Sequence, residues 1–364
     1  MPGQLLGWVV TGVLLSGSIP ATLAAQESSV EPVGSETVVA PGSGDEGCCP
    51  SCFFPRWTAS ADFIILDRIG GGNQTLVERV PGTVPSKDVP NTAGTEALNS
   101  NDFQQGFAGG PRVGLIRHGD DGYDLELSYF QIDGWSSSKS IGPDHPFDWL
   151  VMNCPLDFTQ TNQLPDQAMV WSYATKLYNA EFNVRWNPCD RVTMLAGFRW
   201  INLGENLTGT LNPTTFPWEQ SYWNFWNTTT TNNLYGFQIG ANGKLWERGR
   251  FSIDGLVKAG IFDNDAEQTT EVSVIHKKQV SASDSTNHAA FAGETGLQFR
   301  YQVTQRLTLR ADYEAIWLQG VALAPEQIQE TYVLTDPKTV QALGVNCNSG
   351  VFYHGATFGL EYSF

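Results

Sequence analysis

Three groups of residues in this 364-residue chain are of types that could carry chemistry. Charged side chains of both signs recur at alternate positions in segments that are otherwise apolar. The stretch GPDHPFDW holds Asp144, His145 and Asp148, and an acid beside a histidine is typical of general acid–base catalysis. The stretch CCPSC holds three thiols, which are ligands for soft metal ions. What each group can do depends on the elements that position it.

Alternation of apolar and polar residues predicts antiparallel strands along most of the chain. In LYGFQIGANGKLWERGRFSIDGLVKAGIF (234–262), one parity is apolar and the other is small, polar or charged on both sides of a turn at 247–249. A period of two with one apolar face is typical of a β-hairpin. Similar hairpins turn at 118–122, 187–190 and 304–305. With single strands at 57–67 and 350–364, we expect about ten strands.

The connections between these strands alternate in length. Tight turns lie within the hairpins, and long polar loops are expected between them, at 68–102, 135–170, 204–230, 263–287 and 320–349. This alternation is typical of a barrel of the bacterial outer membrane. The sequence therefore predicts an all-β, up-and-down antiparallel transmembrane β-barrel of about ten strands, with short periplasmic turns and long extracellular loops.

The N-terminal residues predict export. An apolar core, LLGWVVTGVLLS, is followed by small residues in ATLAAQ, which is typical of a signal peptide over residues 1–25. An uncleaved membrane anchor is the alternative, but a core of about 12 residues is too short to span a bilayer. Residues 26–55 read as a flexible Cys-rich leader, and residues 56–364 as the barrel.

Composition bears on the partners and on which face of the sheet points inward. The net charge is −17, which argues against a nucleic-acid partner. Aromatic residues make up 12% of the chain and charged residues only 16%. Charges of both signs lie among glycines on the polar faces, which favours a crowded interior over the solvent face of a secreted sandwich, the alternative fold. We expect the lumen of the barrel to be lined by Arg185, Arg199, Lys244, Asp254, Lys258, Glu294, Arg300, Arg310, Asp312 and Glu314.

The last residues of the chain carry a family resemblance. FGLEYSF (358–364) alternates to the final residue, with Phe358, Leu360, Tyr362 and Phe364 on one face. These four positions match the C-terminal signature of outer-membrane barrels, which their assembly machinery reads. Together with RWTASADFIILDR after a Cys-rich leader, they make the chain resemble the porin-like family of outer-membrane β-barrels.

This resemblance implies a location in the bacterial outer membrane, with the lipid bilayer and the barrel assembly machinery as partners. It also implies a narrow or gated channel for ions or small solutes, because interiors of about eight strands are filled by side chains. A non-conducting structural or surface-binding barrel is the alternative.

An outer-membrane protease or lipase is a third possibility, but the chain has no serine nucleophile elbow and no zinc-type histidine pair. We therefore expect no enzyme, no cofactor and no metal.

In an oxidising compartment, Cys48, Cys49 and Cys52 more readily form disulfides than a metal site. Cys154 and Cys347 both fall in predicted outer loops. A disulfide cannot cross a hydrocarbon layer ~30 Å thick, so we expect Cys154 to pair with Cys347.

The terminal aromatic residue provides a first test. Deleting Phe364, or replacing it with Asp, is expected to slow assembly and leave protein in the periplasm, because it ends the matched signature. Cell fractionation with immunoblotting measures this, and normal barrel yield in the outer membrane would contradict it.

Overall fold

The structure is a computed structural model that describes residues 55–70, 72–85, 88, 92–153, 168–212, 225–273, 280–335 and 338–364. The predicted signal peptide (1–25) and nearly all of the leader (26–55) lie outside these residues. Among the residues described, no helix is long and apolar enough to cross a membrane.

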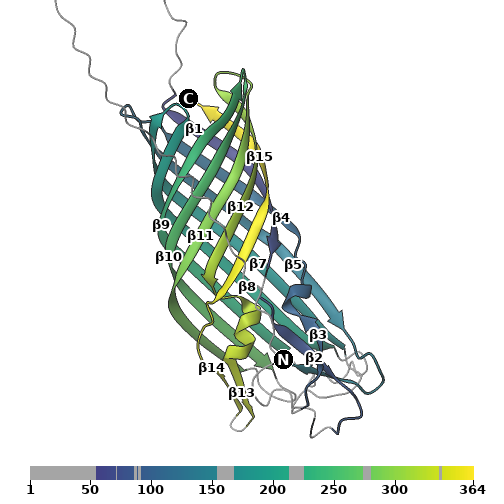
Figure 1. Ribbon diagram of the computed structural model, residues 1–364. Helices are drawn as coiled ribbons and strands as arrows, with labels where there is room; N and C mark the ends of the chain where they lie inside the picture. Colours follow the sequence, from purple (N-terminus) through teal and green to yellow (C-terminus); the bar gives the residue numbers. More distant parts are fainter. Residues whose placement is uncertain are drawn as a thin grey trace, which may run out of the picture. The chain divides into compact units, whose positions relative to one another are not determined.

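Ten antiparallel strands pair in a ring (Figure 1). In ring order after β1 come β15, β12, β11, β10, β9, β8, β7, β5 and β4, which pairs again with β1. The last residue takes part in the closure, because Phe364 N donates to Trp57 O at 2.8 Å and Trp57 N donates to Phe364 O at 2.9 Å. The strands are β1 (Trp57–Ile69), β4 (Phe107–Arg117), β5 (Tyr123–Ile141), β7 (Ala168–Cys189), β8 (Val192–Asn212), β9 (Phe225–Arg248), β10 (Phe251–Ser273), β11 (Val280–Gln302), β12 (Leu307–Val321) and β15 (Ser349–Ser363).

Four short connections lie at the end of the ring where β1 begins and β15 ends, which we call the turn end. They follow β4, β7, β9 and β11 at the predicted positions. Gly122 and Gly249 have positive φ in two of these turns, a backbone conformation that favours glycine. The opposite end, the loop end, receives the long connections.

The strands continue well beyond the predicted loop boundaries. Most of the loops predicted at 204–230 and 263–287 are strand, because β8 runs to Asn212, β10 to Ser273 and β11 begins at Val280. The sequence there lacks an apolar face, as in TTTTNN (228–233), so alternation fails to mark it. β-Branched threonines still favour strands, and side-chain pairs such as Asn206 Nδ2 to Asn227 Oδ1 at 2.8 Å join neighbouring strands.

The other predicted loops contain short elements at the loop end. β2 (Thr75–Val80), β3 (Thr95–Asn99) and β6 (Trp149–Met152) form a three-stranded sheet. The 3-10 helix η2 (Ser100–Asp102) follows β3. After β12 come η4 (Ala324–Glu330) and a hairpin of β13 (Thr331–Thr335) and β14 (Lys338–Ala342).

The apolar faces of the strands point out of the ring. Phe237 and Ile261 are each 74% exposed, whereas Gln238 and Asn264, on the inward parity of the same strands, are buried. The strands of the ring form one sheet and not two stacked ones, so the sandwich alternative is wrong. An exposed apolar belt of this kind fits lipid better than water.

The direction of the side chains on β12 generates a second test. Replacing outward Leu309 or Tyr313 with Arg is expected to cost ~2–4 kcal/mol if the site lies near the bilayer midplane. Asp312→Asn, on the inward face, should fold normally. Urea titration of refolded protein in lipid vesicles measures the difference. Equal folding of the Leu309 and Asp312 variants would show that the assigned facing is wrong.

Candidate functional site: the barrel interior

Four inward charges form a cluster that crosses the lumen in the turn-end half of the barrel. Lys258 Nζ on β10 lies 2.9 Å from Glu181 Oε2 on β7 and 3.2 Å from Glu294 Oε1 on β11. Arg199 Nη1 on β8 lies 2.9 Å from the other oxygen of Glu294. β7 and β10 are not neighbours in the ring, so these ion pairs cross the lumen. Every member of the cluster is buried.

Neutral side chains add hydrogen bonds to this cluster. Gln238 Nε2 donates to Glu181 Oε2 at 2.7 Å, and Arg199 Nε donates to Asn179 Oδ1 at 2.6 Å. Buried charges require such partners, because an unpaired charge in a low-dielectric interior is costly. The cluster therefore braces β7, β8, β10 and β11 against each other.

Further ion pairs lie nearer the turn end. Arg112 of β4 contacts Glu314 of β12 at 2.7 Å across β1 and β15. Arg310 lies 2.9 Å from Asp312 and 3.7 Å from Asp62.

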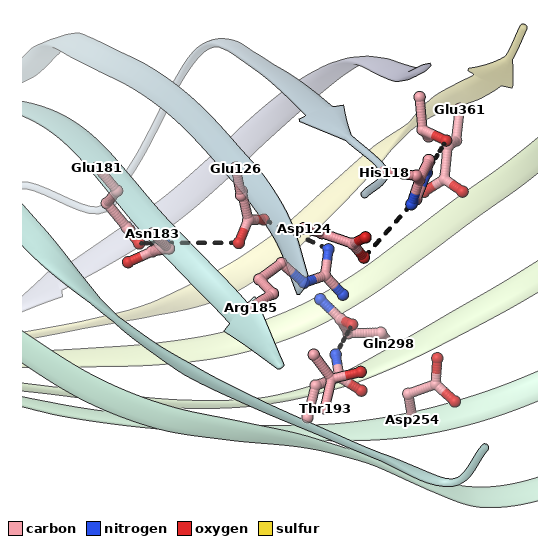
Figure 2. Close-up of polar contacts among 12 residues, drawn as sticks. His118, Asp124, Glu126, Glu181, Asn183, Arg185, Thr193, Asp254, Gln298 and Glu361 are labelled. Atoms are coloured by element: carbon pink, nitrogen blue, oxygen red, sulfur yellow. Dashed lines mark hydrogen bonds and ion pairs between the residues drawn. The ribbon is translucent and has the colours of Figure 1, made fainter. Parts of the chain in front are cut away.

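A third group faces the mouth of the turn end. Figure 2 shows Glu126 between Asn183 and Arg185, whose Nη1 is 4.0 Å from Glu126 Oε1. Arg300 Nε lies 3.4 Å from Asp254 Oδ2. All ten predicted lumen residues thus lie on the inward parity of their strands. Lys244 lies opposite Asp254 close to the turn, and it pairs at 3.0 Å with the exposed Glu247.

A polar cavity opens between these charges and the turn end. Its volume is about 80 Å³. The residues that line it include Ser60, Arg112, Glu126, Arg185, Arg300 and Glu361. The cavity therefore gives the turn-end half of the barrel a wet, charged interior.

An apolar layer closes the interior on the loop-end side of this cavity, which corrects the prediction of a polar lumen. Trp135 of β5 packs on Tyr353 of β15 with the two rings tilted by 44° and their centroids 5.2 Å apart, and its Nε1 donates to Leu66 O at 3.1 Å. The ring places β4 and β1 between β5 and β15, so this contact also crosses the lumen. The layer includes Ile64, Leu66, Phe130, Ile132, Trp135, Leu177, Ile201, Leu203, Leu234, Phe262, Ile316, Leu318 and Tyr353.

The sequence contains a signal for this layer. FIIL (63–66), WINL (200–203) and AIWL (315–318) interrupt the alternation with apolar residues on both parities. A short continuous apolar run is typical of a strand with apolar surroundings on both faces. Here one face points to the exterior of the ring and the other to the apolar layer.

Loop-end elements fill the rest of the mouth. η4 contacts β8 and β9, and its residues Ala324 and Ile328 are completely buried. Residues of β2, β3 and β6 join the same apolar cluster as Trp171 and Trp226 on the inward faces of β7 and β9. The interior therefore has a charged cavity, an apolar layer and a filled loop-end mouth in succession.

The acidic and histidine group lies outside this interior. Asp148 accepts backbone hydrogen bonds from His145 N at 3.0 Å and Gly82 N at 3.2 Å. Asp144 pairs with Arg79 at 2.6 Å. The two carboxylates therefore hold a loop together around the exposed ring of His145. No grouping of three His, Cys, Asp or Glu side chains among the residues described could hold a metal ion.

The cysteines lie at both ends of the barrel. Cys189 is exposed at the turn end, and Cys347 is buried between β14 and β15 at the loop end. Neither forms a disulfide with another cysteine among the residues described. Burial raises the pKa of the Cys347 thiol to about 11. Cys154, Cys48, Cys49 and Cys52 lie outside the described residues, so the pairing of Cys154 with Cys347 stays a prediction.

The C-terminal signature residues line one outward stripe of β15. Phe358, Leu360, Tyr362 and Phe364 are each about half exposed, and the rings of Tyr362 and Phe364 stack at 6.1 Å. Thr357 on the other parity is completely buried. The signature is therefore part of the exterior belt of the ring.

Comparison with known proteins identifies the class to which this ring belongs. Residues 170–364, just over half of the chain, match the model of the family described as "Putative beta barrel porin-7 (BBP7)". The chain belongs to this family, and it is a porin-like β-barrel of the bacterial outer membrane.

Solved structures with a similar arrangement are distant. The outer membrane protease OmpT from Escherichia coli is 10% identical, with a TM-score of 0.41, over 85% of this chain and 96% of its own. The toluene transporter TbuX from Ralstonia pickettii is 10% identical, with a TM-score of 0.35, over 86% and 78%. A Pseudomonas aeruginosa FadL homologue is 11% identical, with a TM-score of 0.27, over 85% and 89%. No curated protein matches the chain significantly.

The buried cluster generates a third test. Arg199→Met leaves Glu181 and Glu294 with too little positive charge in the interior, and the expected cost is ~3–5 kcal/mol. Lys244→Met, its control, removes only a half-exposed pair and should cost ~0–1 kcal/mol. Denaturant titration of the refolded barrels measures both, and equal losses of stability would contradict the bracing role of the cluster.

Proposed function

We propose that this protein is a narrow, gated channel for ions or small solutes, with its turns in the periplasm and its long loops outside the cell. The observation that carries the proposal is the polar cavity at the turn end, which leads to a closure made partly by η4 and the residues before it. A segment that is not part of the wall can move without opening the ring. Conduction would then require displacement of this closure and not of a strand.

The chemistry of the interior limits what such a channel would pass. Charged side chains that line the cavity form ion pairs, and some of these pairs cross the lumen. Large solutes would have to break several of these pairs at once. Small ions or polar solutes are therefore the proposed cargo, and no catalytic step is proposed.

We further propose that the barrel assembly machinery recognises the outward stripe that ends at Phe364, and that the exterior belt is in contact with lipid. Phe364 closes the ring by pairing with Trp57, so recognition of this strand would act where closure is completed.

A non-conducting structural or surface-binding barrel is the second candidate. The apolar layer favours it, because water and ions do not readily enter a lumen filled by side chains. The two candidates differ in whether the layer ever opens.

Single-channel recording in planar bilayers tests the channel. The wild-type protein should show rare, discrete openings, and Trp135→Ala should open at least tenfold more often, because it removes a ring that crosses the lumen. Trp186→Ala, which removes an exposed outward ring, is the matched control and should behave as wild type. If all three remain silent at every voltage while running as folded, heat-modifiable barrels, the non-conducting candidate is favoured.

A further inference from the structure

The chain turns from the wall of the barrel into the lumen at Gly320 and Val321, the last two residues of β12, where Val321 still pairs with Ser349 of β15. Gly320 has φ of 83°, and a Cβ at this position would lie 2.6 Å from Ala289 O, so the turn requires glycine. The residues that follow, Val321–Ala324, are completely buried. This short extended segment therefore lies inside the barrel, surrounded by the strands of the ring.

Asparagines on two strands bind the backbone of this segment. Asn232 of β9 donates from Nδ2 to Ala322 O at 2.8 Å and accepts from Ala322 N at 2.7 Å. Asn264 of β10 donates to Gly320 O at 3.0 Å and to Asn232 Oδ1 at 3.0 Å. Both backbone groups of Ala322 are thus satisfied by one amide side chain, as a neighbouring β-strand would satisfy them.

A carboxylate holds the next alternate residue. Glu205 of β8 is completely buried and accepts from Ala324 N at 2.9 Å. It also accepts from Tyr173 OH at 2.7 Å and pairs with Arg68 of β1 on the far side of the ring. The backbone is therefore held at residues 320, 322 and 324, the spacing of an extended peptide bound along one edge.

The side chains of the segment fit separate surroundings. Val321 and Leu323 join the apolar layer of the lumen. Ala322 is completely buried and packs with Ala266 of β10 and Cys347. The site therefore favours a small residue flanked by aliphatic ones.

We propose that the inward faces of β8, β9 and β10 form a binding site for an extended polypeptide, and that residues 320–324 occupy it as a detachable plug. The inference deepens the proposed channel function and rests on it, since the plug would be the part of the closure that moves. The ligand class is a short apolar peptide that is recognised through its backbone, with a small central residue.

The test uses a substitution in the plug to empty the binding site and then adds the plug sequence as a separate peptide. Ala322→Trp is too large for its place and should expel the segment. A fluorescent peptide with the sequence of residues 318–329, LQGVALAPEQIQ, should then bind the refolded variant at least tenfold more tightly than it binds wild type, as measured by anisotropy. Ala196→Trp, on the exterior, is the control and should bind no better than wild type.

Two further reagents make the result specific. The same peptide with Trp at the position that corresponds to Ala322 should not bind. Adding Asn232→Ala to the Ala322→Trp barrel should abolish binding of the original peptide. If the Trp-containing peptide binds equally well, or if Asn232→Ala has no effect, the site is wrong. Heat-modifiability checks folding, and the smaller Ala322→Val replaces Ala322→Trp if that variant does not fold.

Conductance separates this inference from the proposed function. If Ala322→Trp conducts and the added peptide silences it, both stand. A variant that binds the peptide but never conducts would overturn the channel and leave the binding site. A variant that conducts but does not bind the peptide would overturn the binding site and leave the channel.

Discussion

The structure depends on the need to pair every backbone N–H and C=O group of the wall. Inside a bilayer no water can satisfy an unpaired group, so a sheet must close on itself. Here the closure reaches the last residue, where the backbone of Phe364 exchanges hydrogen bonds with Trp57. An amphipathic strand that continues to the end of the chain follows from this constraint, because a frayed last strand would leave an open edge beside β1.

Closing the ring also determines what the interior must contain. Ten strands enclose a narrow space, and side chains from opposite walls meet within it. Arg68 and Glu205 lie on strands that are four places apart in the ring, and they still form an ion pair. Charges in such a space must be paired with charges of opposite sign, as they are around Glu181 and Glu294. The inward polar side chains therefore hold facing strands together and also line the polar part of the interior.

The interior changes from charged to apolar along the barrel axis, and the proposed function depends on this change. The turn-end half is charged and open, the middle is apolar, and the loop end is filled by segments that belong to the connections. Only part of the closure comes from the wall. The remainder includes residues 320–324, whose backbone is bound by Asn232, Asn264 and Glu205. We propose that this segment can be released without breaking the ring.

The sequence by itself determined the architecture, because alternation in β9 and β10 directly reports that each strand has one apolar and one polar face. It also placed the turns and most inward charges, since parity along a strand decides which side chains share a face. Only the tertiary structure decided where inward residues meet, because contacts across the ring join residues such as Arg199 and Glu294 that have no relation in sequence. It also decided the lengths of the polar strand extensions and the place of residues 320–324. In the sequence these residues follow a strand and look like part of a loop. Only the tertiary structure shows that Asn232, Asn264 and Glu205 on the facing strands bind their backbone inside the lumen.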